Sequence, residues 1–535
     1  MALRLADLGR NRWVVALITS VGLFVTLLDT TIVDIVLPKM MPTLETDVYG
    51  IQWVVIAYFI GAAVSMTMVA WLAERVGHRN CYLVGLGMFV FMSALCGAAN
   101  SLEFMITARF LQGVAEGLVV PVGLLILYDA FPVEQRGLAL GVFALGGVFA
   151  PAVGPSLGGY ITEHLSWRWV FYVNVPIGVV DVLLIAFILA NRRTESRQRH
   201  PPAGVVERRH APPLGPRLDL VGLALLSCAL SSLVVVLTKG QQLAWLQSDL
   251  ILGLALLCAS TFAVFVAWEV FAAEPLIPRA LFRRRTFVVA LVGNAVSTAV
   301  LYGVFFLMPL YLENLRGQTA LQAGLLLVPG SAAAAFGTLV GGVLADRLRP
   351  KWVAVFGLVL TVWMTWHFRL GLDVPLSAIA SHYLFWGFIG TVFAAPVNLL
   401  AIAAVREEDV PHATMLINVL RFVGGSVGTA YMTNVLTSRA SAFYSALASR
   451  IEWGSHAGRE LAARLGSLTG GGEAAVFNPD AYRGTMYMGQ SLLQAVAIGE
   501  AFDVTMKHLA LICLAAAAVV LLARDIKGKG VSMGH

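Results

Sequence analysis

The chain has 535 residues, of which 58% are apolar and only 13% are charged, with a net charge of +6. Soluble globular proteins carry about 25% charged residues, so this composition excludes a set of soluble domains, a disordered chain, a collagen and a coiled coil. The apolar residues stand in long runs rather than in alternating segments of about ten residues, which argues against a membrane β-barrel. We therefore predict an all-α polytopic membrane protein.

Fourteen apolar segments follow one another, each long enough to cross a hydrocarbon core of about 30 Å. They lie at 13–38, 51–72, 81–99, 104–128, 137–162, 170–190, 219–238, 249–271, 286–312, 321–345, 352–371, 377–404, 411–436 and 503–524. The first run follows several arginines but is too long for a signal peptide, so we expect it to remain as the first helix. An even number of spans places both termini on the same side.

The distribution of Lys and Arg predicts which side that is. With the N-terminus inside, roughly 24 of the basic residues lie in cytoplasmic segments and only about five in the short outer loops. Both termini are therefore expected in the cytoplasm. The same rule explains the positive net charge, which in a soluble chain would suggest nucleic acid, so no nucleic-acid partner is expected.

Other classes of site lack their sequence signals. The five cysteines form no Cys-x-x-Cys pair, so neither a zinc site nor a disulfide framework is predicted. A Walker motif is absent, so ATP is not expected to drive the chain directly. Two Gly-x-Ser-x-Gly strings, at 154–158 and 424–428, lack the strand that a hydrolase elbow requires. We therefore predict no catalytic residue, no metal and no enzyme activity.

A short string occurs twice, each time directly after an apolar segment. Residues 70–79 read Ala-Trp-Leu-Ala-Glu-Arg-Val-Gly-His-Arg, and residues 342–351 read Gly-Val-Leu-Ala-Asp-Arg-Leu-Arg-Pro-Lys. A repeat at equivalent loops of two halves is a duplication signature of transporter folds. The acid of each copy can cap the start of a neighbouring helix, while the basic residues hold the inner face closed.

The second copy resembles the Gly-x-Leu-Ala-Asp-Arg motif of the major facilitator superfamily, and four further segments resemble that superfamily's motifs. The four segments are 109–113 (Arg-Phe-Leu-Gln-Gly), 150–159 in the fifth span, 28–33 in the first span, and 167–178 before the sixth. The last two are similar to the fourteen-helix drug:proton antiporters. Two extra helices between the halves, with a long outer loop before the last span, look most like the EmrB branch. The first repeat copy departs from the pattern, with Ala70 for Gly and Glu74 for Asp.

The resemblance implies a particular domain organisation. It comprises an N-terminal six-helix bundle (13–190), a basic cytoplasmic loop (191–218), two linker helices (219–271), a C-terminal six-helix bundle (286–436 and 503–524) and a long periplasmic loop (437–502). The loop is either a binding element or loosely ordered. The EmrB branch further implies a multi-pass protein of the bacterial inner membrane, with a periplasmic adaptor protein and an outer-membrane channel as partners.

An acidic residue inside a membrane span is expected to have a function or a partner. Placing its charged side chain at the bilayer centre costs about 2.5–3.5 kcal/mol of insertion free energy. Asp29 and Asp34 share the first span, and we interpret Asp29 as a carboxylate that exchanges a proton for substrate. A carboxylate paired only for packing is the alternative for Asp29. Asp34 lies nearer the outer end, where it is either a second proton site or a solvated vestibule residue. The family more often has Asn there, so an acid can favour cationic substrates.

Arg109 is the natural counter-charge for an intramembrane carboxylate. In related antiporters the equivalent Arg is implicated in proton coupling, and the resemblance carries that role to Arg109, with a structural tie as the alternative. Glu116 lies two turns further along the same helix and is either a second proton site or a partner for Arg109. Asp181, in the sixth span, is a weaker candidate.

Two further sets of residues are predicted from position. The candidate substrate-cavity residues are Thr30, Trp53, Gln112, Asn294, Asn418 and Arg421, although for Arg421 a structural or coupling role is favoured over substrate contact. The candidate gating residues are Glu74, Arg75, Gly77, Arg79, Gly154, Pro155, Gly158, Gly159, Asp346 and Arg347. Small residues let helices approach closely, and prolines bend them.

These features together predict a proton-driven exporter of amphipathic, drug-like compounds that works by alternating access. The proton gradient supplies the energy, and no cofactor is expected. Apolar and aromatic cavity walls suit lipophilic cations or weak acids. The alternative is a transporter of one solute or lipid on the same scaffold, in which the acids merely recognise a head group.

Overall fold

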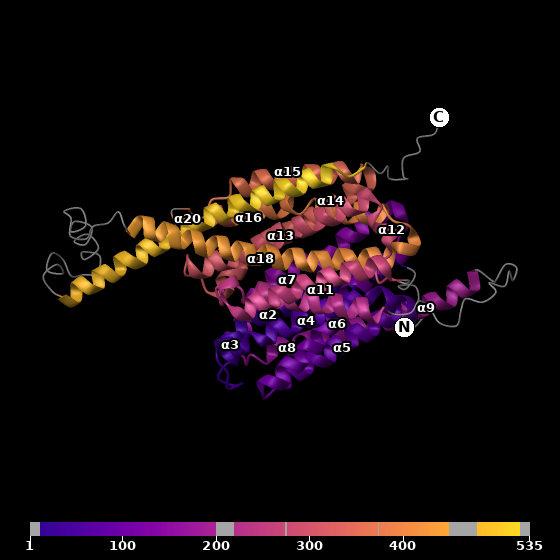
Figure 1. Cartoon of the computed structure of the whole chain (residues 1–535), viewed down its shortest axis with the longest axis horizontal. Helices are drawn as coiled ribbons and strands as arrows, with labels where there is room; N and C mark the ends of the chain where they lie inside the picture. The colour runs from indigo at the N-terminus through magenta and orange to yellow at the C-terminus, as the bar shows by residue number, and fades with distance from the viewer. Residues whose placement is uncertain (1–10, 200–218, 273–274, 373, 449–478, 525–535) are drawn as a thin grey trace.

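The computed structural model describes residues 11–199, 219–272, 275–372, 374–448 and 479–524, and every regular element in these ranges is a helix (Figure 1). The α-helices are α2 (Arg12–Met40), α3 (Val48–Ile51), α4 (Trp53–Val76), α5 (His78–Ala98), α6 (Leu102–Ala130), α7 (Arg136–His164), α8 (Trp169–Tyr172), α9 (Asn174–Arg199), α10 (Leu220–Lys239), α11 (Asp249–Phe271), α12 (Arg279–Phe282), α13 (Arg285–Asn314), α14 (Ala320–Arg347), α15 (Pro350–Trp366), α16 (Leu376–Gly390), α17 (Ala394–Ala403), α18 (Val410–Ala448) and α20 (Pro479–Leu521). The short 3-10 helices are η1 (Val133–Gln135), η2 (Trp245–Gln247) and η3 (Glu407–Asp409).

Within these ranges, 12 helices are long and apolar enough to cross a membrane, and α7 adds a thirteenth span if its two segments, bent by 41°, count as one. Helix α15 has only 17 residues, about 26 Å at 1.5 Å per residue. Each of the fourteen predicted segments falls mainly on one helix or on two consecutive helices, and the last five residues of 352–371 run past the end of α15. The all-helical polytopic fold is confirmed, while the count of fourteen spans and the cytoplasmic termini remain predictions.

The long helices pack as two groups, drawn in indigo to violet and in pink to yellow in Figure 1. We call α2, α4, α5, α6, α7 and α9 the N-terminal group, and α13 to α18 with α20 the C-terminal group. The two groups meet chiefly where α7 packs along α14 and where α4 packs against α18. The site described below lies inside the first group and along this junction.

Helices α10 and α11 lie beside the junction. Helix α10 contacts α4 of one group and α18 of the other. At its end, Lys239 Nζ donates to Tyr49 O over 3.3 Å and to Gln52, and Gln241 Nε2 donates to Thr437 Oγ1 over 3.0 Å. The most apolar part of α11 is only 11% buried, so this helix presents its surface to lipid.

The last two long helices exceed what a membrane requires. Helix α18 has 39 residues and α20 has 43, which is about 58 and 64 Å at 1.5 Å per residue. Figure 1 shows both running past the ends of their neighbours. The predicted long loop, 437–502, is therefore helical at both of its described ends, and 449–478 lies outside the described residues. Similarly, 191–199 of the predicted basic loop continues α9, and 200–218 lies outside them.

Helices α4 and α6 approach closely because glycines line their contact. A Cβ on Gly113 would lie 2.0 Å from Tyr58 O, and one on Gly61 would lie 2.1 Å from Phe110 O. Real atoms do not come so close, so only glycine permits this spacing. The close approach brings Arg109, one turn before Gly113, against the backbone of α4.

Candidate functional site

A buried ion pair joins α2 to α6 inside the N-terminal group. Asp29 is 0% exposed and Arg109 is 1% exposed, and Arg109 Nη1 donates to Asp29 Oδ2. Either charge alone would cost several kcal/mol at this depth, so each makes the other tolerable. The structure thus brings together the acid and the base that the sequence singled out on separate spans.

Two amides complete the surroundings of the Asp29 carboxylate. Asp29 Oδ1 accepts hydrogen bonds from Gln112 Nε2 over 3.0 Å and from Asn174 Nδ2 over 2.8 Å. Asn174 Nδ2 also lies 3.2 Å from Ser93 Oγ. Helices α2, α5, α6 and α9 therefore all contribute to one polar cluster, in which the ionised form of Asp29 is fully hydrogen-bonded.

The Arg109 guanidinium has partners besides Asp29. Its Nε donates to Val54 O over 3.3 Å, and its Nη1 donates to Gln112 Oε1 over 2.9 Å. The guanidinium carbon lies 4.1 Å from the centre of the Tyr58 ring, a cation–π distance. Arg109 would therefore keep several favourable contacts if Asp29 became neutral.

Glu116 lies two turns further along α6 and is 6% exposed. The ion-pair partner of Arg109 is Asp29 and not Glu116. Glu116 interacts electrostatically with Tyr58, Asp29 and Arg109, and also with Arg421 of the C-terminal group. It therefore lies between the buried ion pair and the opposite half of the molecule, and its role as a second proton site remains a prediction.

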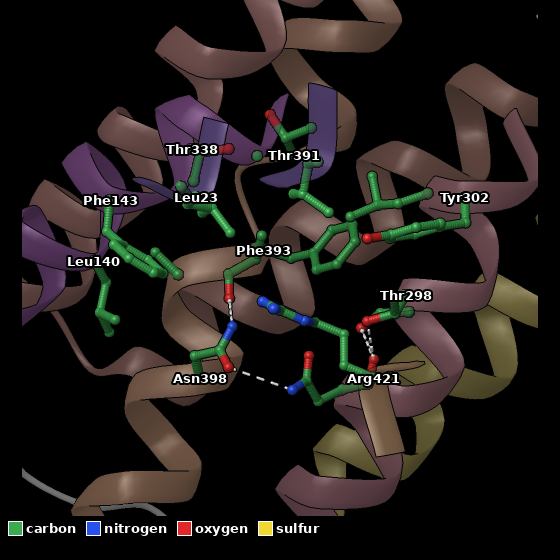
Figure 2. Close-up of a pocket in the computed structure, with 18 of the residues that line it drawn as sticks. Leu23, Leu140, Phe143, Thr298, Tyr302, Thr338, Thr391, Phe393, Asn398 and Arg421 are labelled. Carbon is green, nitrogen blue, oxygen red and sulfur yellow. Dashed lines mark hydrogen bonds between the residues drawn. The ribbon is translucent and has the colours of Figure 1, made fainter. Parts of the chain in front are cut away.

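A cavity of about 120 Å³ lies where the two groups meet (Figure 2). Its walls come from α2, α6 and α7 on one side and from α13, α14, α17 and α18 on the other. Most lining side chains are apolar or aromatic. The lining includes Leu23, Leu27, Phe143, Tyr302, Phe305 and Phe393. Such walls with few polar groups are typical of sites for amphipathic ligands.

Arg421 is the charged residue in this lining, and Figure 2 shows its guanidinium pointing into the cavity. Among the described residues it has no hydrogen-bond or ion-pair partner, only electrostatic interactions with Glu116 and Tyr302. Beside it, Asn294 Nδ2 donates to Asn398 Oδ1 over 3.3 Å. This placement makes Arg421 accessible to a ligand in the cavity, and the structural or coupling role favoured from the sequence stays a prediction.

The other predicted cavity residues lie elsewhere. Gln112 belongs to the Asp29 cluster. Thr30 Oγ1 lies 3.2 Å from Thr26 O and 3.5 Å from the Tyr58 hydroxyl, inside the N-terminal group. Trp53 begins α4 and is 41% exposed, and Asn418 Nδ2 donates to Thr414 O over 2.8 Å within α18. The side chain of Asp34 lies outside the described residues.

We call the end of the bundle that carries the two repeated turns, 70–79 and 342–351, the motif end. Here Asp346, on the last turn of α14, accepts hydrogen bonds from two backbone amides at the start of α7. Gly137 N lies 2.8 Å from Asp346 Oδ1, and Leu138 N lies 2.8 Å from Oδ2. The prediction that this acid caps a neighbouring helix is confirmed, and the cap joins the two groups.

The first copy of the repeat uses a different contact at the equivalent place. Glu74, at the end of α4, has its Oε1 3.9 Å from Nδ1 of His412, in the first turn of α18. The longer side chain of Glu, compared with the usual Asp, faces a side chain rather than a backbone amide. Both repeat copies therefore join one group to the other at the motif end.

The basic residues of the first copy do not bridge the groups. The Arg75 guanidinium lies 5.2 Å from the ring centre of Trp71, and Arg79 Nη2 donates to Ala186 O over 2.8 Å. Both contacts stay within the N-terminal group, and the expectation that the basic residues hold the inner face closed stays a prediction. Gly77 has φ +85°, which only glycine adopts readily, and it ends α4. Arg347 is exposed at the end of α14.

The small residues of α7 allow close packing on both of its neighbours. A Cβ on Gly154 would lie 2.3 Å from Thr31 Oγ1 of α2, and Gly158 and Gly159 are buried, with carbonyls that accept from Thr162 Oγ1. Pro155 lies at the 41° bend between segments 136–151 and 156–164, although its side chain is outside the described residues. The close contact at Gly154 and the bend at Pro155 agree with close packing and helix bending, whereas the gating role of all four residues stays a prediction.

Comparison with known families decides the identity of the fold. The family model of the Major Facilitator Superfamily matches residues 19–429. The chain belongs to the major facilitator superfamily. Members of the superfamily are transporters rather than enzymes, and the many apolar helices make this member a multi-pass membrane protein.

Relatives within the superfamily confirm the resemblance to the EmrB branch. The multidrug export protein EmrB of Escherichia coli (strain K12) is 28% identical over 443 residues, which cover 82% of this chain and 83% of the relative. An uncharacterized MFS-type transporter, YhcA of Bacillus subtilis (strain 168), is 30% identical over 83% of this chain and 80% of the relative. The fatty acid resistance protein FarB of Neisseria gonorrhoeae is 27% identical over 84% and 86%.

Among solved structures, the fold is similar to a bacterial homolog of the human lysosomal transporter Spinster in an inward-facing and unoccupied conformation. The TM-score is 0.51 with 16% sequence identity, over 96% of this chain and 96% of that chain. At this identity the likeness shows the shared transporter fold alone.

Proposed function

We propose that this member of the superfamily is a proton-driven exporter of amphipathic, drug-like compounds that works by alternating access. The observation that supports this most directly is the buried pair of Asp29 and Arg109. A carboxylate enclosed in the N-terminal group, apart from the cavity, is suited to bind a proton rather than a large substrate.

The position of α2 suggests how a proton on Asp29 can affect the cavity. Leu23 and Leu27 of α2 line the cavity, whereas Asp29 faces α6 and α9. Two residues further along a helix is about 200° of rotation, so Leu27 and Asp29 point to opposite sides. Protonation removes the charge that holds α2 to Arg109, and the same helix then moves a wall of the cavity.

The cavity supports an amphipathic substrate. Its aromatic and aliphatic walls suit a lipophilic body, and the unpaired guanidinium of Arg421 suits an anionic head group. This makes weak acids better candidates than cations at this position. The names of the relatives, multidrug export protein and fatty acid resistance protein, agree with such substrates.

We further propose that the motif end faces the cytoplasm, with both chain termini on that side of a bacterial inner membrane. The excess of Lys and Arg in the corresponding segments supports this orientation. Contacts of Asp346 with Gly137 and of Glu74 with His412 would then hold the cytoplasmic ends of the two groups together. Alternating access requires these contacts to break and re-form.

The extensions of α18 and α20 support a partner on the other side. Both helices run beyond the bundle at the end opposite to the motif end (Figure 1). In a bacterium with an inner and an outer membrane, this surface would contact a periplasmic adaptor protein, which in turn connects to an outer-membrane channel. The proton gradient would supply the energy without a cofactor.

The test uses the purified protein in liposomes with a pH dye inside and an imposed proton gradient. We expect an amphipathic weak acid or a lipophilic cation to cause proton movement in the wild type, and we expect Asp29→Asn to abolish that movement. Asp249→Asn, which removes an exposed carboxylate at the start of α11, is the matched control.

Two results would redirect the proposal. Proton movement that survives in Asp29→Asn would transfer the proton site to Asp34 or Glu116. A wild type that moves no protons with any cation or weak acid would favour the alternative, a superfamily transporter of one solute or lipid without a role in drug efflux.

A further inference from the structure

A second buried carboxylate lies in the N-terminal group, apart from Asp29. Asp181 of α9 is 1% exposed, and Tyr82 of α5 is 0% exposed. Among the described residues, neither oxygen of Asp181 has a hydrogen-bond partner within bonding geometry, and neither does the Tyr82 hydroxyl. Tyr82 is nevertheless close enough to interact with Asp181 electrostatically. Buried polar groups without partners are uncommon and call for a functional explanation.

The two groups converge on a single glycine of α2. A Cβ on Gly22 would lie 1.9 Å from the Tyr82 hydroxyl oxygen and 3.1 Å from Asp181 Oδ2. Three helices therefore meet at this point, and the space that Gly22 leaves is taken by the hydroxyl and the carboxyl. The space beside Gly22 is therefore filled by these two groups, and no further side chain fits there.

No cation is available to balance a charge on Asp181 within the described part of the chain. On the packed helix α5, the basic side chain of Arg79 donates to Ala186 O. On α2 the charged group on the same face as Gly22 is Asp29, which Arg109 already balances. An ionised carboxylate without a cation costs several kcal/mol when buried, whereas a carboxylic acid can donate its proton to the adjacent hydroxyl. The site therefore suits a bound proton.

Asp181 is aligned with the Asp29 cluster on two helices at once. Asn174 and Asp181 are seven residues apart on α9, and Gly22 and Asp29 are seven residues apart on α2. Seven residues are two turns and about 10 Å along a helix, so each pair shares one face. Asn174 contacts Asp29 directly. Asp181 therefore lies two turns along α9 from the proposed proton site at Asp29, on the same face of that helix.

Polar groups also occur between and beyond these two carboxylates. Thr26 lies on the same face of α2, with its Oγ1 3.1 Å from Gly22 O, and the Tyr58 hydroxyl donates to Thr26 O over 3.3 Å. On α5, His78 lies one turn before Tyr82 at the motif end, where its Nδ1 is 2.6 Å from Asp129 Oδ2. A row of polar groups thus leads from Asp29 toward the surface at the motif end.

We propose that Asp181 and Tyr82 form a second proton-binding site, which carries protons between Asp29 and the motif end. This rests on the proton coupling of the proposed function. In the transfer, the carboxyl of Asp29 loses its proton and becomes the carboxylate that pairs with Arg109. The carboxylate of Asp181 accepts that proton and later releases it at the motif end by way of the Tyr82 hydroxyl and His78.

The transport test compares two measurements in liposomes for wild type, Asp181→Asn and Asp249→Asn. We expect Asp181→Asn to slow gradient-driven, substrate-dependent proton movement by about tenfold or more. Exchange of labelled substrate across the membrane without a gradient should remain near the wild-type rate, because the cavity is unchanged. Tyr82→Phe, which keeps the ring, is expected to slow proton movement as well. It replaces Asp181→Asn as the test variant if Asp181→Asn does not fold.

Infrared spectra of the purified variants, each subtracted from the spectrum of the wild type, give a readout that does not depend on transport. We expect the carbonyl band of a protonated carboxyl group to be lost in Asp181→Asn and to shift in Tyr82→Phe, with Asp249→Asn unchanged. An unchanged band and unchanged proton movement would overturn the proposal, and so would an equal fall in proton movement and substrate exchange. If the wild type moves no protons, the proposed function fails, while the infrared band still decides whether Asp181 holds a proton.

Discussion

Asn174 donates a hydrogen bond to Asp29 over 2.8 Å, from the first residue of α9 to the middle of α2. This contact links α9 to the buried ion pair. Because the acceptor is an ionised group, the bond contributes about 1.5–3 kcal/mol. It also means that any movement of α2 that follows protonation of Asp29 has to break or lengthen a contact with α9.

We therefore expect Asn174→Ala to lower the unfolding temperature of the wild type. In a protein that already carries Asp29→Asn, the same substitution should lower it much less. The measurement is thermal unfolding in detergent for both single variants and the double variant. Asn80→Ala, which removes an exposed amide from α5, is the control and should have little effect. Additive losses in the double variant would show that Asn174 does not act through the charge on Asp29.

The contact of α4 with α6 gives a second prediction. In Gly113→Ala the new Cβ would meet Tyr58 O at 2.0 Å, so the two helices must separate. Overpacking of this kind costs about 1–3 kcal/mol, and it also moves Arg109 away from Val54 and Tyr58. We expect a lower unfolding temperature together with slower proton-coupled transport.

Gly87→Ala is the matched control for that variant, because nothing lies within 4 Å of a Cβ at this position on α5. In a helix interior this change is expected to leave stability unchanged or to raise it by up to about 1 kcal/mol. A Gly113→Ala variant as stable and as active as Gly87→Ala would contradict the claim that α4 and α6 lie too close together for a Cβ at position 113.

Much of the fold could be predicted from the sequence, because the apolarity of a membrane span is a local property. Each predicted segment could be recognised from its own residues, and each falls mainly on one helix or on two consecutive helices. The predicted spans 411–436 and 503–524 cover only part of α18 and α20 for the same reason. Hydropathy stops at the edge of the membrane, whereas the helix continues as long as its backbone hydrogen bonds are made.

The site was predictable only where a residue was out of place in a membrane. Asp29 and Arg109 needed partners, and the structure pairs them. Asn174 and Tyr58 are neutral, so nothing local distinguished them, although Asn174 lies within a motif quoted for the resemblance. The direction of Arg421 depends on how α18 is rotated against α13, and no pattern along one helix determines that rotation.

The cap of α7 by Asp346 gives a third prediction. Asp346→Ala removes the acceptor for two backbone amides, those of Gly137 and Leu138, at a cost of about 0.5–2 kcal/mol. Because the acid and the amides belong to different groups, the loss also weakens the contact between the groups at the motif end. We expect faster hydrogen–deuterium exchange in peptides that cover the first two turns of α7.

Glu163→Ala is the control, since this exposed acid lies at the other end of α7. It should leave exchange at residues 136–142 as in the wild type. Exchange that stays the same in Asp346→Ala would mean that the cap is absent in solution, and that the motif end is held together by other contacts.

The unpaired guanidinium in the cavity gives the last prediction. Arg421→Gln keeps a polar side chain of moderate length but removes the charge, and Arg421→Lys keeps the charge without the planar donor geometry. A charge-assisted hydrogen bond contributes about 1.5–3 kcal/mol, so binding of a carboxylate ligand should weaken by at least about tenfold in Arg421→Gln and by less in Arg421→Lys.

A fatty acid and its uncharged amide make a matched pair of probes, because they share the apolar chain and differ in the head group. If Arg421 recognises the anion, the wild type binds the acid more tightly than the amide, and Arg421→Gln binds the two alike. Isothermal titration of the purified protein measures both affinities. Equal losses for acid and amide would instead show that Arg421 shapes the cavity through its interactions with Tyr302 of the same group and with Glu116 across the junction.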